Sequence, residues 1–359
     1  MSKTSFKPSD ELKKERGEKI HPLSADLQEY KNSLGDGSRE FRGLATGFNE
    51  IDEVIGGLDR FILLAGRSGA GKTTLALQLA LGVAQSKPVL IYSFEMSRNE
   101  IITSLVKATA HRLGLEGLYT KTIELQGNNP NLDPKVADTI AQSLTELDRT
   151  GERLFIKDSS QGIPSILPYN TDNTDKGKDP KKPTIYDDIE QVKKLCKSDD
   201  VLVLIDSVQD VVDTQKANQV QAEIEAVSDL TILQQRTGAT ILVTAQKNKG
   251  SVKSTDSYGD VMGSMAFIHK PNTVLELHTF KEVIARADKN DKTDLKDLAD
   301  EIERGAKQGN CKPMMLEIVK GRFTGQGELP LRFYGAYGYF EAGIDKNYKD
   351  TYDNMRELF

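Results

Sequence analysis

Short apolar runs alternate with amphipathic segments through most of the chain, from about residue 43 to residue 340. The apolar runs predict buried strands at 61–65, 88–94, 153–157, 201–206, 239–245, 273–278, 314–319 and 329–333. The segments between them carry apolar residues at helical spacing and predict helices at 74–84, 98–113, 134–148, 185–197 and 217–236. Strands that alternate with helices favour parallel pairing. The pattern therefore predicts an α/β fold with a doubly wound, mainly parallel sheet and helices on both faces.

The first 42 residues differ from the rest, because they are polar and rich in Lys and Glu. They predict an N-terminal arm that is too polar to form a core of its own. One helix is expected within it, capped by Ser24 and ended by Gly35. Its apolar stripe consists of Leu23, Leu27, Tyr30 and Leu34. We expect this stripe to pack on its own domain or to dock on a neighbouring subunit.

Residues 43–345 are expected to form one domain with two insertions. Residues 169–183 contain almost nothing apolar and predict a loop, after which Thr184 is expected to cap a helix. Residues 281–312 are highly charged and form the second insertion, and residues 346–359 are expected to be a tail.

Composition narrows the possible partners and the setting. The net charge of −6 means that a nucleic-acid partner requires a local basic lining. Cys196 and Cys311 form no CxxC pair, which argues against zinc and against a disulfide framework. There is no apolar run of about 18 residues and no signal-peptide core, so we expect no membrane span and a cytoplasmic protein.

The stretch from Gly66 to Thr73 fits the phosphate-binding pattern GxxxxGK[ST] at every required position. A predicted strand precedes it and a predicted helix follows it, which is the setting that this loop requires. A glycine-rich turn that matches by chance is the alternative. We expect Lys72 to reach the β- and γ-phosphates of ATP and the Thr73 hydroxyl to bind Mg²⁺. The predicted nucleotide-binding residues are Gly66, Arg67, Ser68, Gly69, Ala70, Gly71, Lys72, Thr73 and Thr74.

Two carboxylates follow buried strands and are candidates for the chemistry of hydrolysis. Asp206 ends the strand 201–206, where it is expected to hold Mg²⁺ beside the phosphate loop. The alternative is an aspartate that caps the loop after a strand. Glu95 follows the strand 88–94 and is a candidate to polarise the attacking water. A surface glutamate at the start of a helix is equally compatible with its spacing.

Gln246 follows the strand 239–245, and it is a candidate to contact the γ-phosphate and to report its loss. The segment from residue 247 to 265 is rich in Gly, Ser and Lys. Its lysines Lys247, Lys249 and Lys253 are candidates to contact a DNA phosphate backbone. Any solvated loop also carries such residues, so both interpretations stay open.

Lys320 and Arg322 lie at the end of the strand 314–319, two residues apart. Side chains at i and i+2 on a strand point the same way. The pair is a candidate arginine finger with a companion lysine, inserted into the site of a neighbouring subunit. Ordinary solvated surface is the alternative.

The order of these motifs resembles the RecA-like motor domain of DnaB-type replicative helicases. The resemblance begins with Thr46-Gly47-Phe48, Ile51-Asp52 and Gly56-Gly57-Leu58 ahead of the phosphate loop, and it continues with Ser93 to Ser97. Residues 204–209, 244–246 and 320–325 are similar to later family motifs, the last in the form found in phage primase–helicases and in Twinkle. The resemblance covers roughly residues 43–340.

This resemblance implies an ATP-dependent DNA helicase that forms a hexameric ring and translocates on single-stranded DNA in the central channel. It implies that Glu95 is the catalytic base and that Lys320 and Arg322 act in trans on the adjacent subunit's nucleotide. It also implies an N-terminal helix that docks on the neighbour, and an aromatic residue that stacks on the nucleotide base, for which Tyr334 is the nearest candidate.

The chain departs from the family in two places. Residues 259–264 lack the arginine and glutamate of the family's DNA loop. The polar arm is also too short for the family's collar or primase domain, so a primase or loader protein is an expected partner. Two alternatives remain: a RadA-like recombination ATPase, although no zinc finger is present, and a KaiC-like scaffold or signalling NTPase that does not move DNA.

Overall fold

The chain separates into two compact units, residues 1–40 and residues 41–359. The computed structural model describes residues 23, 27, 31, 41–115, 117–168, 183–212, 219–247, 266–279, 282, 311–322 and 326–343. In the first unit Leu23 and Leu27 are helical and exposed, whereas Tyr30 and Leu34 lie outside the described residues. The docking role of this helix and the limits of the domains stay predictions.

Nine strands in the described part of the chain form one sheet, in the order β3-β2-β4-β5-β1-β6-β7-β8-β9. The first six strands in this order are parallel to one another, and β7, β8 and β9 are antiparallel to their neighbours. The strands are β1 (Phe61–Gly66), β2 (Val89–Ser93), β3 (Leu154–Asp158), β4 (Leu202–Asp206), β5 (Thr240–Gln246), β6 (Thr273–Thr279), β7 (Lys312–Gly321), β8 (Gly327–Tyr334) and β9 (Tyr339–Ala342).

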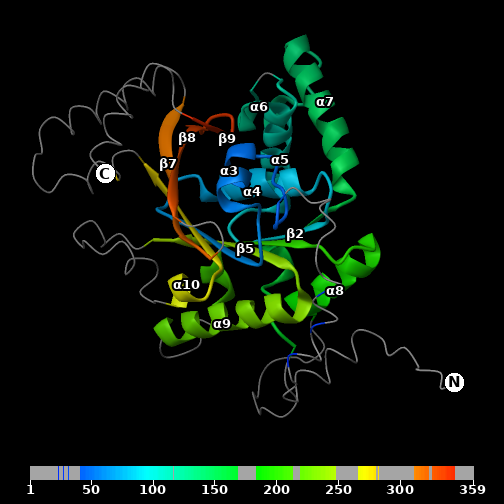
Figure 1. Cartoon of the computed structure of the whole chain (residues 1–359). Coiled ribbons are helices and arrows are strands. Elements are labelled where there is room, and N and C mark those ends of the chain that lie inside the picture. Colours follow the sequence, from blue (N-terminus) through cyan, green and yellow to red (C-terminus); the bar gives the residue numbers. More distant parts are fainter. Residues whose placement is uncertain are drawn as a thin grey trace, which may run out of the picture. The chain divides into compact units, whose positions relative to one another are not determined.

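Helices cover both faces of the sheet, as Figure 1 shows. One face packs on α3 (Asn49–Ile55), α4 (Lys72–Val83), α5 (Arg98–Arg112), α6 (Thr120–Gln126) and α7 (Pro134–Gly151). The other face packs on α8 (Ile185–Cys196), α9 (Gln219–Thr237) and α10 (Ala266–His269). The short 3₁₀ helices are η1 (Ser159–Gln161) and η2 (Val208–Val211). Among the described helices, none combines the length and the apolar character that a membrane crossing requires.

The predicted fold class is confirmed. All eight predicted strands are present, and each begins and ends within two residues of its predicted bounds. Thr184 caps α8 through a capping box with Asp187, as predicted. The pattern missed β9, whose place in the fold depends on α4. The side-chain amide of Gln78 donates to the Phe340 carbonyl and accepts from the Phe340 N–H, at 2.9 and 2.7 Å. Residues 169–182 of the first insertion, most of the second insertion and the tail lie outside the described residues.

The turn before α3 packs against α4, the helix that follows the phosphate loop. The buried Asp52 carboxylate accepts hydrogen bonds from the Thr46 N–H, the Thr46 hydroxyl and the Gly47 N–H, at 2.8 to 3.1 Å. These bonds fix the Thr46 carbonyl directly against Gly82 of α4. A Cβ at Gly82 would lie 1.4 Å from that carbonyl oxygen, so only glycine fits.

Gly82→Ala should therefore lower the free energy of unfolding by at least about 2 kcal/mol, because the backbone on both sides must separate. Gly151→Ala, at the end of α7, is the matched control, since a Cβ there meets open space. We expect the control to change stability by less than about 0.5 kcal/mol. Urea unfolding of both variants measures the difference, and equal stabilities would contradict the packing.

The hairpin of β8 and β9 docks on α5 through aromatic contacts. The His111 ring stacks on Tyr339 with 3.6 Å between ring centroids and 3° between ring planes. Burial lowers the pKa of His111 below its usual value, and the Glu341 carboxylate only partly opposes this shift. The neutral imidazole is therefore the form that the folded protein favours.

This shift predicts a loss of stability on mild acidification. Above the ordinary histidine pKa of about 6.5, His111 is neutral in both the folded and the unfolded chain, so its burial does not make stability depend on pH. As the pH falls below that value the unfolded chain binds a proton first, so stability decreases. His111→Phe keeps the stack and should show a smaller drop in urea midpoint between pH 7.5 and 5.5. An identical drop in both proteins would show that His111 does not carry the effect.

Candidate nucleotide-binding site

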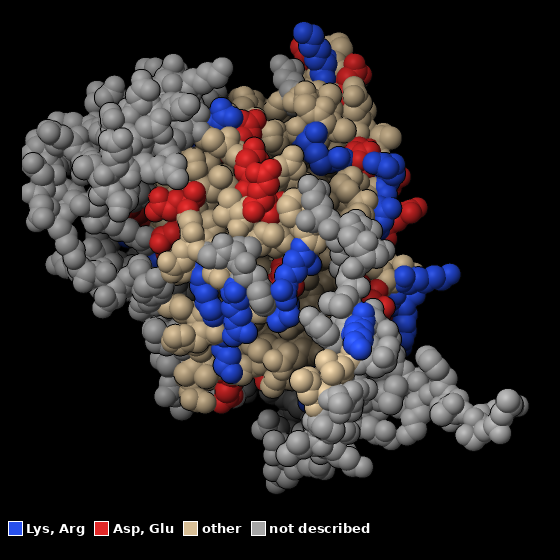
Figure 2. All heavy atoms as spheres, viewed as in Figure 1, with Lys and Arg blue, Asp and Glu red and all other residues tan. Residues whose placement is uncertain are grey.

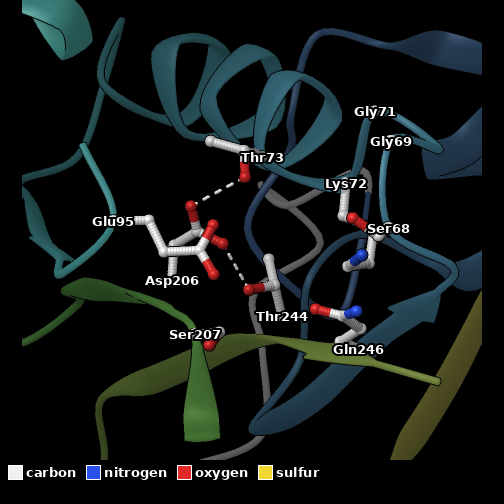
Figure 3. A pocket seen from close by; sticks show the side chains of 10 residues that line it. All are labelled: Ser68, Gly69, Gly71, Lys72, Thr73, Glu95, Asp206, Ser207, Thr244 and Gln246. Atoms are coloured by element: carbon white, nitrogen blue, oxygen red, sulfur yellow. Dashed lines mark hydrogen bonds between the residues drawn. The ribbon is translucent and has the colours of Figure 1, made fainter. Parts of the chain in front are cut away.

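The carboxyl ends of β1, β2, β4 and β5 meet at one edge of the sheet, because these strands are parallel. A pocket of about 190 Å³ opens there, in front of the N-terminus of α4. Figure 3 shows the side chains that line it. They include all five residues predicted to act in cis: Lys72, Thr73, Glu95, Asp206 and Gln246.

The phosphate loop joins β1 to α4 through left-handed backbone at Gly69 and Gly71, with φ of 73° and 91°. A side chain at Gly71 would also collide with the Phe340 ring, since a Cβ would lie 2.8 Å from it. No side chain caps α4 at this end. The first-turn N–H groups and the positive end of the helix dipole are therefore available to an anion.

Lys72 brings a positive charge into this pocket. Its ammonium donates a hydrogen bond to the Arg67 carbonyl at 2.9 Å. Burial lowers the pKa of Lys72, and the carboxylates of Asp206 and Glu95 act in the opposite direction. The Arg67 guanidinium turns away to pair with Glu282 at 2.5 Å. The pocket therefore presents an ammonium and free helix N–H groups together, which suits a polyphosphate.

Asp206 is the buried carboxylate of the pocket, with 5% of its surface exposed. One oxygen accepts a hydrogen bond from the Thr73 hydroxyl at 2.8 Å, and the other accepts one from the Thr244 hydroxyl. Carboxylate and hydroxyl oxygens are the ligands that Mg²⁺ prefers, so these groups fit that ion. Sequence analysis missed Thr244. A polar residue inside the apolar strand, two places before Gln246, was the available signal.

Glu95 and Gln246 approach the pocket from two different strands. Glu95 extends from the loop after β2 toward Asp206, and Gln246 extends from the end of β5 beneath Lys72 and Ser68, as Figure 3 shows. The backbone carbonyl of Gln246 accepts a hydrogen bond from the Gln209 side chain at 3.3 Å.

Lys320 and Arg322 lie at the opposite edge of the sheet. Gly321 pairs with Thr273, which pairs with Ile62 near the start of β1. Gly66 lies four positions after Ile62, which corresponds to about 13 Å along the strand at 3.3 Å per residue. Arg322 is therefore remote from the phosphate loop of its own chain.

Lys320 is engaged within its own chain. Burial lowers the pKa of Lys320, and the nearby charge of Arg322 lowers it further. The Lys320 ammonium donates to the carbonyls of Ile268, His269 and Pro271 at 2.7 to 2.9 Å, which holds the end of α10. Arg322 is exposed. Figure 2 shows Lys and Arg side chains gathered around α9 and α10.

The structure does not support the predicted contact of Lys247 with DNA phosphates. Its side chain is 6% exposed, and the ammonium pairs with Glu276 at 2.7 Å. Lys249, Lys253 and the altered loop at residues 259–264 lie outside the described residues.

Tyr334 ends β8, and its ring centroid lies 4.8 Å from that of Tyr339. Burial is the main cause that raises the pKa of Tyr334 to about 12, and the Glu341 carboxylate adds to it. The aromatic rings against the phosphate loop are those of Phe333 and Phe340. The base-stacking role of Tyr334 stays a prediction.

Comparison with known proteins agrees with this geometry. Residues 43–162 match the family model of the DnaB-like helicase C terminal domain. This part of the chain is related to the DnaB-type replicative helicases. The resemblance predicted from the motifs is thereby confirmed.

Two curated relatives show how far the likeness extends. Replicative DNA helicase DnaB of Leifsonia xyli subsp. xyli is 42% identical over 79 residues, which cover 21% of this chain and 17% of that protein. DNA repair protein RadA of Aquifex aeolicus is 34% identical over 121 residues, which cover 33% of this chain and 23% of that protein. The chain thus matches less than a quarter of the length of either relative.

The likeness in fold extends much further than the likeness in sequence. A solved DnaB-like replicative helicase, described together with its interactions with primase, superposes with a TM-score of 0.64. The superposition covers 90% of this chain and 67% of that one, at 18% identity. A separately solved ATPase domain superposes with a TM-score of 0.67 over 91% of this chain and 100% of its own, also at 18% identity. At that identity both superpositions support the RecA-like fold alone.

Asp206→Asn tests the metal role of the carboxylate. For the unaltered chain we expect removal of Mg²⁺ by EDTA to weaken binding of a fluorescent ATP analogue at least about tenfold, or about 1.4 kcal/mol. For Asp206→Asn the change should be less than about twofold, because an amide holds Mg²⁺ poorly. Asp148→Asn, on the exposed side of α7, is the control. An undiminished response to Mg²⁺ in Asp206→Asn would exclude this role.

Proposed function

We propose that the chain is the motor of an ATP-dependent, cytoplasmic ring helicase that translocates on single-stranded DNA. The observation that carries this proposal is a single pocket lined by Lys72, Thr73, Glu95, Asp206 and Gln246. Lys72 and Thr73 begin α4, and the other three come from the ends of β2, β4 and β5. Each has the chemistry that one part of phosphoryl transfer requires.

In this proposal each cis group has one task. Lys72 and the N–H groups at the start of α4 bind the β- and γ-phosphates. Thr73 and Asp206 hold Mg²⁺, which supplies charge neutralisation of the phosphate oxygens when bound. Glu95 accepts a proton from the water that attacks the γ-phosphorus, the bond from that phosphorus to the bridging oxygen breaks, and ADP leaves with the oxygen.

The remaining charge comes from a second subunit. Arg322 lies at the opposite edge of the sheet from Lys72, and a guanidinium there reaches only a nucleotide bound to a neighbour. Lys320 supports Arg322 by fixing the end of α10. Tyr334 is proposed to stack on the base. A hexameric ring with nucleotide at each interface satisfies these requirements.

DNA binding is proposed for the segment that follows Gln246. In this position a loop responds to loss of the γ-phosphate, and Lys249 and Lys253 offer cations for a phosphate backbone. A primase or loader protein is proposed as a further partner. The RadA-like alternative is not favoured, because the matching family model is that of the DnaB-like helicases and the RadA relative is a weaker match.

Strand displacement on forked DNA tests the helicase proposal. We expect unwinding that requires ATP, Mg²⁺ and a free single strand, and ATP hydrolysis that single-stranded DNA stimulates. Lys72→Ala is the control that should do neither. Hydrolysis that no DNA affects, with no displacement, would contradict the helicase proposal and favour the KaiC-like alternative.

Trans action of Arg322 has its own test. Arg322→Ala should bind nucleotide normally but hydrolyse it about a thousandfold more slowly, as loss of an arginine finger predicts. Mixing it with Lys72→Ala chains should restore part of the activity, since each supplies what the other lacks. Mixing it with the Lys72→Ala/Arg322→Ala double variant should restore none. Normal hydrolysis by Arg322→Ala alone would rule out the trans role.

A further inference from the structure

Two carboxylates face each other across β6 and β7. Glu276 and Glu317 are direct partners in the antiparallel register, so their side chains lie on the same face. His278 shares that face, because it is two residues from Glu276. Like charges directly opposite each other destabilise a sheet unless cations separate them.

Lys247 supplies one of these cations. It follows β5, which is separated from β6 by β1. Its N–H donates to the Gly66 carbonyl at 3.1 Å, which extends the pairing of β5 with β1 by one residue. Its ammonium reaches Glu276 on β6 at 2.7 Å, with side-chain exposures of 6% and 1%. The side chain must cross β1, where Ala65 pairs with Ala245 on one side and Glu276 on the other. A methyl group leaves room for that crossing.

His278 completes the group. Its Nε2 lies 3.0 Å from an oxygen of Glu317 and 3.1 Å from an oxygen of Glu276. Burial by itself raises the pKa of Glu276, but the hydrogen bond from His278 and the charge of Lys247 outweigh it and lower the value to about 2. Glu276 is therefore ionised at neutral pH, and its carboxylate forms an ion pair with the Lys247 ammonium.

The ligand atoms of Glu276, His278 and Glu317 lie within 4.8 Å of one another, a spacing that a metal ion could bridge. The ammonium of Lys247, 2.7 Å from Glu276, already supplies a cation to this group. The group therefore fixes Lys247, and through Lys247 the end of β5 that carries Gln246.

Lys247 directly follows Gln246, the last residue of β5. Pairing of β5 with β4 ends at Val243, three residues earlier, while pairing with β1 continues to Gln246. Beyond Val243 the Thr244 hydroxyl still donates to Asp206 at the end of β4, and the Gln209 side chain and the Lys247–Glu276 pair hold the last residues of β5. A strand end whose backbone is paired on one side only frays more easily than one that is paired on both sides.

We propose that Lys247 is a positioning residue for γ-phosphate recognition, anchored by Glu276 and His278 so that Gln246 points into the nucleotide pocket. This inference rests on the proposed contact of Gln246 with the γ-phosphate. The charge of Lys247 is then committed to the interior of the protein, so the proposed DNA contact falls to Lys249 and Lys253.

The test measures discrimination for the γ-phosphate, as the ratio of affinities for ADP·beryllium fluoride and for ADP. Gln246→Ala sets the reference and should reduce the ratio about tenfold, the loss expected for one hydrogen bond to a charged group. Lys247→Met keeps the length of the side chain and removes its charge. It should reduce the ratio at least about threefold and leave ADP affinity within about twofold, because only the γ-phosphate contact is lost.

Because Lys247→Met removes the ammonium that pairs with the buried Glu276 carboxylate, it can also destabilise the fold. The double variant Lys247→Met/Glu276→Gln removes both charges at similar volume and should regain stability. The tether is still missing in this variant, so its ratio should stay low. Lys194→Met, on the exposed side of α8, is the matched control and should leave the ratio unchanged.

Each contrary result has a distinct meaning. A normal ratio in Gln246→Ala refutes the sensor role and the inference with it. A reduced ratio in Gln246→Ala with a normal ratio in the folded double variant refutes the inference alone. A marked loss of single-stranded DNA affinity by Lys247→Met without nucleotide also overturns it, because a buried ammonium cannot bind DNA.

Discussion

The parallel registers of β2, β4, β5 and β1 determine which groups meet at the nucleotide pocket. Ser93 pairs with Asp206, and Gly66 pairs with Gln246, so the strands end at one edge. The hydroxyls of Thr73 and Thr244 then bind the two oxygens of Asp206, which ties α4 and β5 to β4. A slip of one residue in any of these strands would turn its terminal polar side chain to the other face.

The antiparallel strands determine where Arg322 lies. Because β7 runs against β6, it carries Arg322 to the edge where the parallel strands begin, away from the phosphate loop. A cation at that edge cannot complete the site of its own chain. The same sheet also carries the buried pair of Lys247 and Glu276 across β1, so the groups proposed for recognition, hydrolysis and subunit contact belong to one sheet.

Sequence pattern predicted the strands, and it also predicted which polar residues meet at the pocket. Buried strands of a parallel sheet are continuous apolar runs, and a polar residue at the end of each one is easily recognised. β9 escaped prediction because a side chain of α4 fixes it. The burial of Lys247 depends on Glu276, 29 residues later, and on a small residue between them. Lys320 likewise meets carbonyls that come together only through the tertiary fold.

We have proposed that each chain holds half of a catalytic site and that a neighbour completes it. Particle images of the protein with a nonhydrolysable ATP analogue and single-stranded DNA test this most directly. We expect closed rings with nucleotide at the subunit interfaces, Lys72 of one subunit and Arg322 of the next on the same triphosphate, and DNA in the channel. Single subunits, or rings in which Arg322 faces solvent while nucleotide is bound, would contradict it.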